Sequence, residues 1–513
     1  MSEALPRSGA KPGVPPLLIA GLVSFGTLFE TMNSTGLAVA LNTIAGDLAS
    51  SPEESDTVLT AYLIANAAIL PISGWASVYF GRKKYYITCV ALFTIASALC
   101  AMAWSLESLI FFRILQGMAA AGNAASETSL IADTMPPEKR GLGFALYGMA
   151  VVIGPTIGPI YGGWVAENYS WSWIFWINVP TGIAAVVACS LLLRDPPAVE
   201  KQTREKRARG VRADWFGFAM AALGLATLSY VLDRGQSNDW FGSSRILVAA
   251  IVSSLCLLIL PIRELTARDP VLDVRMFADR NFTGSWLLLF VTGAVLFSAP
   301  AVFPLLTQQG FGYTATWAGF ANGLGGLSVL FVIPLVGLLT GKVATRHLVG
   351  FGLAVSAVGL FMSTRIYPDV SFMQVALFNV GQSIGIAFII SPLQSQSFVG
   401  VPNGRSEQVG AFNSMAINVG GSVGTALSIT LLERGRQTYR EQLVPYASPY
   451  RDEYRQALQD YGSVGAFDAV LNGQASILAF QHVFFALACV IVVSLPLVLL
   501  LRGKPGEEEQ QQG

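Results

Sequence analysis

The sequence predicts an all-helical membrane protein, with two six-helix bundles and two further helices between them. Of its 513 residues, 53% are hydrophobic and only 12% are charged, whereas soluble domains carry about a quarter charged residues. The charges also cluster, which leaves uncharged windows such as 85–106 and 141–166. A helix of about 20 apolar residues crosses about 30 Å of hydrocarbon. These windows therefore indicate membrane spans, and they exclude a soluble multidomain enzyme.

Fourteen apolar windows, bounded by charges or turn residues, follow one another in the order six, two, six. We expect an N-terminal bundle in 1–193, a basic linker with spans seven and eight in 194–281, and a C-terminal bundle in 282–513. The last part includes a long outer loop, 433–475, and a cytoplasmic tail. The expected spans lie near 16–41, 57–79, 85–104, 108–131, 142–165, 171–193, 214–232, 245–263, 283–305, 315–339, 347–366, 371–394, 408–432 and 476–500.

The basic residues predict the orientation of these spans. With both termini in the cytoplasm, the inside loops hold 23 of the 32 Lys and Arg residues, and the outside loops hold eight. Cytoplasmic loops of membrane proteins carry such an excess, and an even number of spans agrees with it. The first fifteen residues show no cleavage pattern, so we expect no removable signal peptide. A net charge of zero predicts no nucleic-acid partner.

The sequence shows no motif for a disulfide framework, a metal site or an ATP-binding loop. All five cysteines lie in apolar segments, so we expect neither a disulfide nor a metal site, and no cofactor. The segment Gly337–Val343 is similar to a phosphate-binding loop, but its glycine spacing is one residue short and Val343 replaces the required Ser or Thr. We therefore expect no ATP site and no enzyme, so any transport by this chain would have to draw on an ion gradient as a secondary active transporter does.

The fifth span carries an unusual glycine pattern, with Gly154, Gly158, Pro159, Gly162 and Gly163 close together. In a helix in water, each glycine would cost about 1 kcal/mol and a proline about 3 kcal/mol. In a membrane, small residues let two helices approach closely, and proline is tolerated. The spacing therefore predicts a close helix contact in a transporter of repeated bundles.

Several motifs, in the right order along the chain, give a resemblance to the major facilitator superfamily. Within it, the chain resembles the fourteen-span drug/proton antiporters of the EmrB/QacA type. The matching residues are Gly74, Gly81, Arg82 and Lys83 between spans two and three, Arg113, Gln116 and Gly117 in span four, Gly154–Gly163 in span five, Trp171–Gly182 in span six and Leu232–Trp240 after span seven.

The resemblance implies proton-driven efflux of amphipathic compounds across a bacterial inner membrane. Its implied partners are small substrates, protons and the lipid bilayer, together with a periplasmic adaptor and an outer-membrane channel. One alternative is a proton-coupled permease for a single metabolite, such as a fatty acid or a siderophore. Another is a structural or sensory membrane protein. The outer loop 433–475 is either a solvated connector or a docking surface for the adaptor.

Three charges fall well inside the predicted spans: Glu30, Arg113 and Glu127. Such residues cost at least about 2.5–3.5 kcal/mol on insertion and by default face a bundle interior or a water-filled path. We expect all three to serve proton coupling, with a structural hydrogen-bonding role as the alternative for each. Arg113 and Glu127 lie fourteen residues apart, or about 21 Å along a helix, which excludes a direct ion pair.

The sequence departs from the family pattern at two positions. The family usually has an aspartate in the first span where this chain has Asn33, while Glu30 lies one helical turn earlier. The loop motif usually has an aspartate where Val78 stands, so we expect a weaker charge latch between the bundles. The predicted substrate-cavity residues are Asn33, Gln116, Asn379 and Gln382. The predicted conformational motifs comprise Gly74, Gly81, Arg82, Gly154, Gly158, Pro159, Gly162 and Gly163.

Overall fold

The computed structural model describes residues 14–136, 139–195, 197–208, 214–267, 270–311, 313, 315–367, 370–401, 405–446 and 463–501. These residues form helices and no β-strand, apart from an isolated bridge between Thr340 and Val343. The predicted all-α class is confirmed. The expected tail and most of the outer loop, 447–462, lie outside the described residues.

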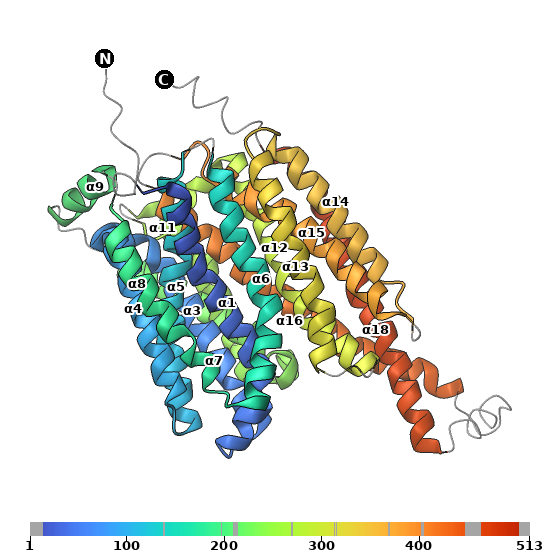
Figure 1. Cartoon of the computed structure of the whole chain (residues 1–513). Coiled ribbons are helices and arrows are strands. Elements are labelled where there is room, and N and C mark those ends of the chain that lie inside the picture. Colours follow the sequence, from blue (N-terminus) through green and yellow to red (C-terminus); the bar gives the residue numbers. More distant parts are fainter. Residues whose placement is uncertain are drawn as a thin grey trace.

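The long helices follow one another along the chain as Figure 1 shows, and we group them by the predicted bundles. The N-terminal bundle contains α1 (Pro16–Asp47), α3 (Thr57–Phe80), α4 (Arg82–Ala101), α5 (Leu106–Thr134), α6 (Arg140–Asn168) and α8 (Asn178–Leu192), with short helices α2 (Pro52–Ser55) and α7 (Trp173–Trp176). The connecting part contains α9 (Pro197–Ala208), α10 (Trp215–Arg234) and α11 (Ser244–Thr266). The C-terminal bundle contains α12 (Arg280–Leu305), α13 (Ala315–Leu339), α14 (Thr345–Ser363), α15 (Phe372–Ser397), α16 (Ser406–Leu443) and α18 (Val464–Ser494).

Thirteen helices of the described chain are long and apolar enough to cross a membrane. The predicted fourth span, α5, is 29 residues long but is not among them. It carries Arg113 and Glu127, and its second half is almost wholly buried among other helices. Because neighbouring helices enclose this second half, it does not need a continuous apolar surface. The count of fourteen spans stays a prediction.

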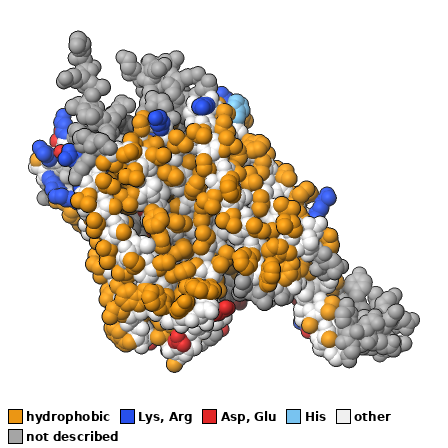
Figure 2. Space-filling view, in the orientation of Figure 1, with side chains coloured by type: hydrophobic (Ala, Val, Ile, Leu, Met, Phe, Trp, Pro, Cys, Tyr) orange, Lys and Arg blue, Asp and Glu red, His pale blue; other side chains and the backbone are white. Residues whose placement is uncertain are grey.

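The surface agrees with a protein that lies in a bilayer. In Figure 2, hydrophobic side chains cover the flank of the bundle, while Lys and Arg gather toward the upper end and Asp and Glu toward the lower end. Helix α1 begins and α18 ends toward the upper end (Figure 1), which we call the terminal end. The chain is therefore a multi-pass membrane protein.

The outermost helices are longer than the sequence predicts. Helix α16 runs for 38 residues to Leu443, and α18 begins at Val464. Both extend beyond the apolar windows expected at 408–432 and 476–500. Arg440 of α16 and Asp468 of α18 form an ion pair of 3.1 Å in these extensions. The connection between these two helices is therefore shorter than the expected loop 433–475, because polar residues at both ends of that loop continue the flanking helices.

The glycines of the fifth predicted span line the contact between α1 and α6. Gly154, Gly158 and Gly162 recur every four residues, so they lie on one face of α6. A Cβ added at Gly158 would stand 2.7 Å from the Met32 carbonyl oxygen, and one added at Gly162 would collide with the backbone of Gly36. The predicted close helix contact therefore lies within the N-terminal bundle, where it packs α6 onto α1.

The two bundles meet along α6 and α13, and again where α3 and α5 meet α16. Hydrogen bonds cross between the bundles near the terminal end. Ser129 donates to the Ser406 carbonyl at 3.0 Å, and Ser391 donates to the Gly141 carbonyl at 3.1 Å. Helices α10 and α11 pack on each other, and α10 also packs against α3 and reaches α16. The extra pair is thus attached to the flank where the two bundles meet.

Candidate transport site

A cavity of about 350 Å³ lies between the two bundles. Its walls come from α1, α3 and α10 on one side and from α12 and α16 on the other. The lining mixes apolar side chains with hydroxyl and amide groups, such as Ser34, Asn66 and Asn418. Among the described residues that line it, only Glu30 and Asp233 carry a charge. The cavity is therefore partly apolar and acidic.

Glu30 reaches this cavity from α1. The hydroxyl group of Tyr62, on α3, donates a hydrogen bond of 3.0 Å to its carboxylate. Glu30 is partly buried, so its carboxylate meets both the cavity and the bundle interior.

Arg113 is fully buried behind Tyr62. Its guanidinium lies 4.2 Å from the centroid of the Tyr62 ring, and a cation in this position is attracted to the ring face. It donates to the side-chain oxygens of Asn33 at 3.3 Å and Gln116 at 2.6 Å, and its Nη2 has no hydrogen-bond partner among the described residues. Tyr62 therefore links the predicted arginine to Glu30 without a direct ion pair.

Glu127 does not line the cavity, although it is fully buried. Thr27 of α1 donates a hydrogen bond to one oxygen of its carboxylate, and the other oxygen has no hydrogen-bond partner among the described residues. Thr27 lies three residues before Glu30, so the two positions are neighbours on one face of α1. Glu30 on α1 and the Glu127 carboxylate beside Thr27 therefore lie at neighbouring turns of the same helix.

The four predicted cavity amides are not among the described residues that line this cavity, which differs from the expectation. Asn33 and Gln116 are buried, and their side-chain oxygens accept hydrogen bonds from Arg113. Asn379 donates to the side-chain oxygen of Asn322 at 2.8 Å within the C-terminal bundle. Gln382 is also buried in that bundle. Buried amides find partners wherever they are enclosed, so polarity inside a span did not distinguish cavity from packing.

The loop motif lies at the junction of α3 and α4. Gly81 has a φ of +90°, a backbone conformation that favours glycine, and Arg82 beside it is fully buried and pairs with Asp133. Gly74 faces the backbone of α16, where an added Cβ would stand 3.6 Å from the Glu407 carbonyl oxygen. The motif therefore contacts both bundles at the terminal end.

Asp195 supports the same junction from the connection after α8. Its carboxylate accepts a hydrogen bond of 2.8 Å from the backbone N–H of Lys83. Burial raises the pKa of this carboxyl above its usual range, while the hydrogen bond and the charge of Arg82 act in the opposite direction.

Sequence reasoning missed Glu407, which lies at the start of α16. Its side chain is fully buried, accepts a hydrogen bond from Ser77, and interacts electrostatically with Arg82. Ser77 stands directly before Val78, where the family pattern has its aspartate. A carboxylate from the C-terminal bundle thus reaches the place expected for one from the N-terminal bundle. Glu407 lies one residue before the expected span 408–432, so it was not among the charges predicted to lie inside spans.

Sequence reasoning also missed Asp233. The expected seventh span ended at Leu232, whereas α10 continues to Arg234 and places Asp233 in its last turn. The signal was present, since the segment Leu232–Trp240 matched a family pattern. Its position at a span edge concealed that the side chain lines the cavity.

Comparisons with known proteins agree with this architecture. The family model described as "Major Facilitator Superfamily" matches residues 23–425. The "Multidrug export protein EmrB" of Haemophilus influenzae is 34% identical over 85% of this chain and 84% of its own length. The protein of the same name from Escherichia coli K12 is 31% identical over 97% of each chain. The solved structure of the human organic anion transporter MFSD10 covers 94% of this chain and 100% of its own, with a TM-score of 0.58 at 16% identity, which shows the fold alone.

The family match, the relatives and the helical architecture confirm the resemblance seen in the sequence motifs. The chain belongs to the major facilitator superfamily and, within it, to the EmrB-type transporters.

Proposed function

We propose that this protein is a secondary active transporter that exports amphipathic cations in exchange for protons, with Glu30 as the group that binds both. The single observation that carries the proposal is the position of Glu30 in the wall of the cavity between the bundles. The names of the two EmrB relatives support export of several drugs. The mixture of acidic and apolar lining supports a cation with an apolar body.

Antiport follows from competition for one carboxylate. An ionised Glu30 attracts a cationic substrate, whereas a protonated Glu30 does not, so substrate and proton exclude each other. Tyr62 donates to this carboxylate and also lies against Arg113. A change of charge at Glu30 therefore reaches the buried arginine through one side chain, which gives Arg113 a role in coupling. Glu127 on α5, which accepts a hydrogen bond from Thr27 one turn before Glu30, would serve as a second proton site behind the cavity.

The conformation fits a release state if both termini are cytoplasmic, as the basic residues predict. The cavity is lined by the halves of α1, α3 and α10 that lie away from the terminal end. Near the terminal end, the bundles are joined by the contacts of Ser129 with Ser406 and of Ser77 with Glu407. The cytoplasmic path is then closed and the outer path is accessible. The opposite arrangement, needed for loading, requires these contacts to separate.

The proposal is tested with purified protein in proteoliposomes loaded with ethidium and subjected to a pH gradient. Glu30→Gln keeps a side chain of similar size but cannot titrate, so we expect gradient-driven ethidium transport to be lost. Glu54→Gln is the matched control, because Glu54 is exposed and lies outside the cavity. Full gradient-driven transport by a correctly inserted Glu30→Gln variant would refute Glu30 as the carrier. Transport of one metabolite alone, without ethidium, would favour the permease.

A further inference from the structure

The two helices between the bundles contribute directly to the central cavity. Four residues from the outer half of α10 line it: Leu225, Ser229, Leu232 and Asp233. Because α10 packs on α3 and reaches α16, it stands at the flank where the bundles meet. The last turn of α10 therefore adds to the cavity wall a carboxylate that comes from neither six-helix bundle.

The two carboxylates of the cavity reach it from different sides of α3. Tyr62 donates to Glu30, and Thr60 donates to Asp233. Thr60 and Tyr62 are two residues apart on α3, which corresponds to a rotation of about 200° around the helix axis. Glu30 on α1 and Asp233 on α10 are therefore held on nearly opposite faces of α3. They form two separate acidic points in one cavity.

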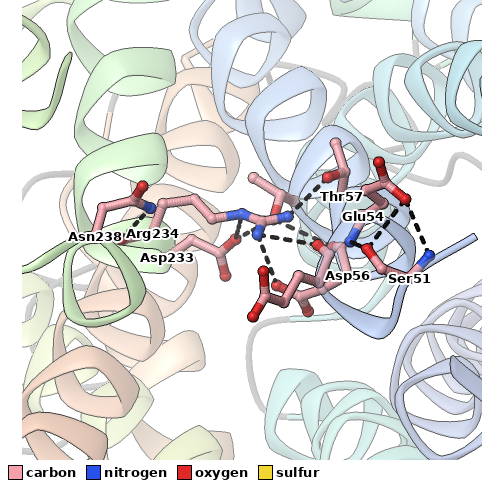
Figure 3. A network of polar contacts seen from close by, with 9 residues as sticks. Ser51, Glu54, Asp56, Thr57, Asp233, Arg234 and Asn238 are labelled. Carbon is pink, nitrogen blue, oxygen red and sulfur yellow. Dashed lines mark hydrogen bonds and ion pairs between the residues drawn. The ribbon is translucent and has the colours of Figure 1, made fainter. Parts of the chain in front are cut away.

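The neighbouring arginine, Arg234, is shared between Asp233 and Asp56. The Arg234 guanidinium donates to Thr57 at 2.9 Å and to Thr60 at 3.1 Å, and it pairs with Asp56 at 3.3 Å (Figure 3). Its distance to the Asp233 carboxylate is longer, 4.0 Å. One guanidinium thus serves two carboxylates, and its closer ion pair is with Asp56. Two carboxylates and one guanidinium leave a net negative charge in this cluster, and Asp233 is its carboxylate that lines the cavity.

The Asp233 carboxylate also has a free oxygen. Its Oδ2 takes part in the contacts with Thr60 and Arg234, while Oδ1 makes no hydrogen bond with any described residue. Figure 3 shows one oxygen of Asp233 turned away from the network around Arg234. A positively charged group in the cavity can approach this oxygen without breaking the bond to Thr60.

We propose that Asp233 is a specificity-determining residue, and that it anchors the second positive charge of divalent amphipathic cations whose first charge is held at Glu30. This inference rests on the proposed function, since Glu30 binds the first charge in both. Substrates with one charge need only Glu30, so their transport does not depend on Asp233. The extra helix α10 thereby widens the range of substrates that the cavity accepts.

Ethidium and propidium are suitable probes, because they share one aromatic ring system and propidium carries an additional quaternary ammonium group. We expect Asp233→Asn to raise the KM for propidium in proteoliposomes by about 10-fold or more, the loss expected for one charge-assisted contact. The KM for ethidium should change little. Asp233→Glu, which keeps the charge, should restore propidium transport.

The matched control is Asp56→Asn. Asp56 pairs with the same arginine but does not line the cavity, so this variant disturbs the network without removing the proposed anchor. Equal effects of Asp56→Asn and Asp233→Asn would show a structural role for Asp233 and overturn the inference. So would equal losses for both probes in Asp233→Asn.

Ser229→Arg gives a second route to the same answer if Asp233→Asn does not insert into the membrane. Ser229 lines the cavity one turn before Asp233, so an arginine there would neutralise the carboxylate. We expect a selective loss of propidium transport, and unchanged selectivity would overturn the inference. Failure of the proposed function is distinguishable, because wild-type protein would then show no gradient-driven ethidium transport at all.

Discussion

The glycine face of α6 allows a sharp test of the packing between α1 and α6, using two adjacent positions. A Cβ at Gly162 would collide with the oxygen, carbonyl carbon and Cα of Gly36. These are backbone atoms, so α1 itself must shift. A Cβ at Gly163 would meet only the Val39 side chain at 3.4 Å, an ordinary contact. We therefore predict that Gly162→Ala destabilises the protein and that Gly163→Ala does not.

The pair also isolates the size of the effect. Each variant replaces a helical glycine by alanine, which favours a helix by about 1 kcal/mol, and this gain cancels when the two are compared. What remains is the overpacking cost at Gly162, about 1–3 kcal/mol. For a unit of 150–250 residues, 1 kcal/mol shifts Tm by about 2–4 °C. We expect an apparent Tm about 2–12 °C lower for Gly162→Ala than for Gly163→Ala.

The measurement is thermal unfolding of the two purified variants in one detergent, at one scan rate because membrane proteins often unfold irreversibly. Equal melting temperatures would refute the reasoning, since they would mean that α1 and α6 do not approach at Gly36. A transport defect without loss of stability would also contradict it. The contact lies within one bundle, so its first effect should be on folding.

Two further predictions concern the polar network and the terminal end. Tyr62→Phe removes the hydrogen bond to Glu30 but keeps the ring over Arg113. Since such a bond contributes about 1.5–3 kcal/mol, we expect a correctly inserted variant to show gradient-driven ethidium efflux about 10-fold slower or more. Efflux at the wild-type rate would contradict a link through Tyr62. Glu407→Gln removes a charge from the contact between the bundles at the terminal end, so this contact should open more often. A cysteine introduced at Ala411, which is buried there in the structure, should then be alkylated faster. An unchanged alkylation rate would argue against a latch.

Much of the site was predictable from the sequence where a residue's chemistry conflicts with its surroundings. Glu30, Arg113 and Glu127 were predicted because charge inside an apolar window is costly, and the structure places all three around α1 or behind Tyr62. The glycine spacing of span five likewise predicted a close helix contact. In both cases the signal is local, because it depends only on the span in which the residue lies.

Residues at span edges and neutral polar residues were not predictable in the same way. Asp233 and Glu407 lie at helix ends, where charged residues are ordinary in a membrane protein. Only the packing of α10 shows that Asp233 lines the cavity, and only the packing of α16 shows that Glu407 reaches the opposite bundle. Asn33 and Gln116 looked equally suited to a cavity. Their partner, Arg113, lies three residues from Gln116 but eighty from Asn33, so the contact that decides their role is partly remote in sequence.

The sequence by itself determined that this chain is a helical membrane protein, because apolar length, charge placement and helix period are properties of each segment. Its motifs added the resemblance to a transporter family. The tertiary structure alone decided which charges share one cavity. Glu30 and Asp233 are more than two hundred residues apart, and they belong to one site only because α3 holds a tyrosine toward one and a threonine toward the other. The physical reason is that a span is selected by its contact with lipid, whereas a site is made by contacts between spans.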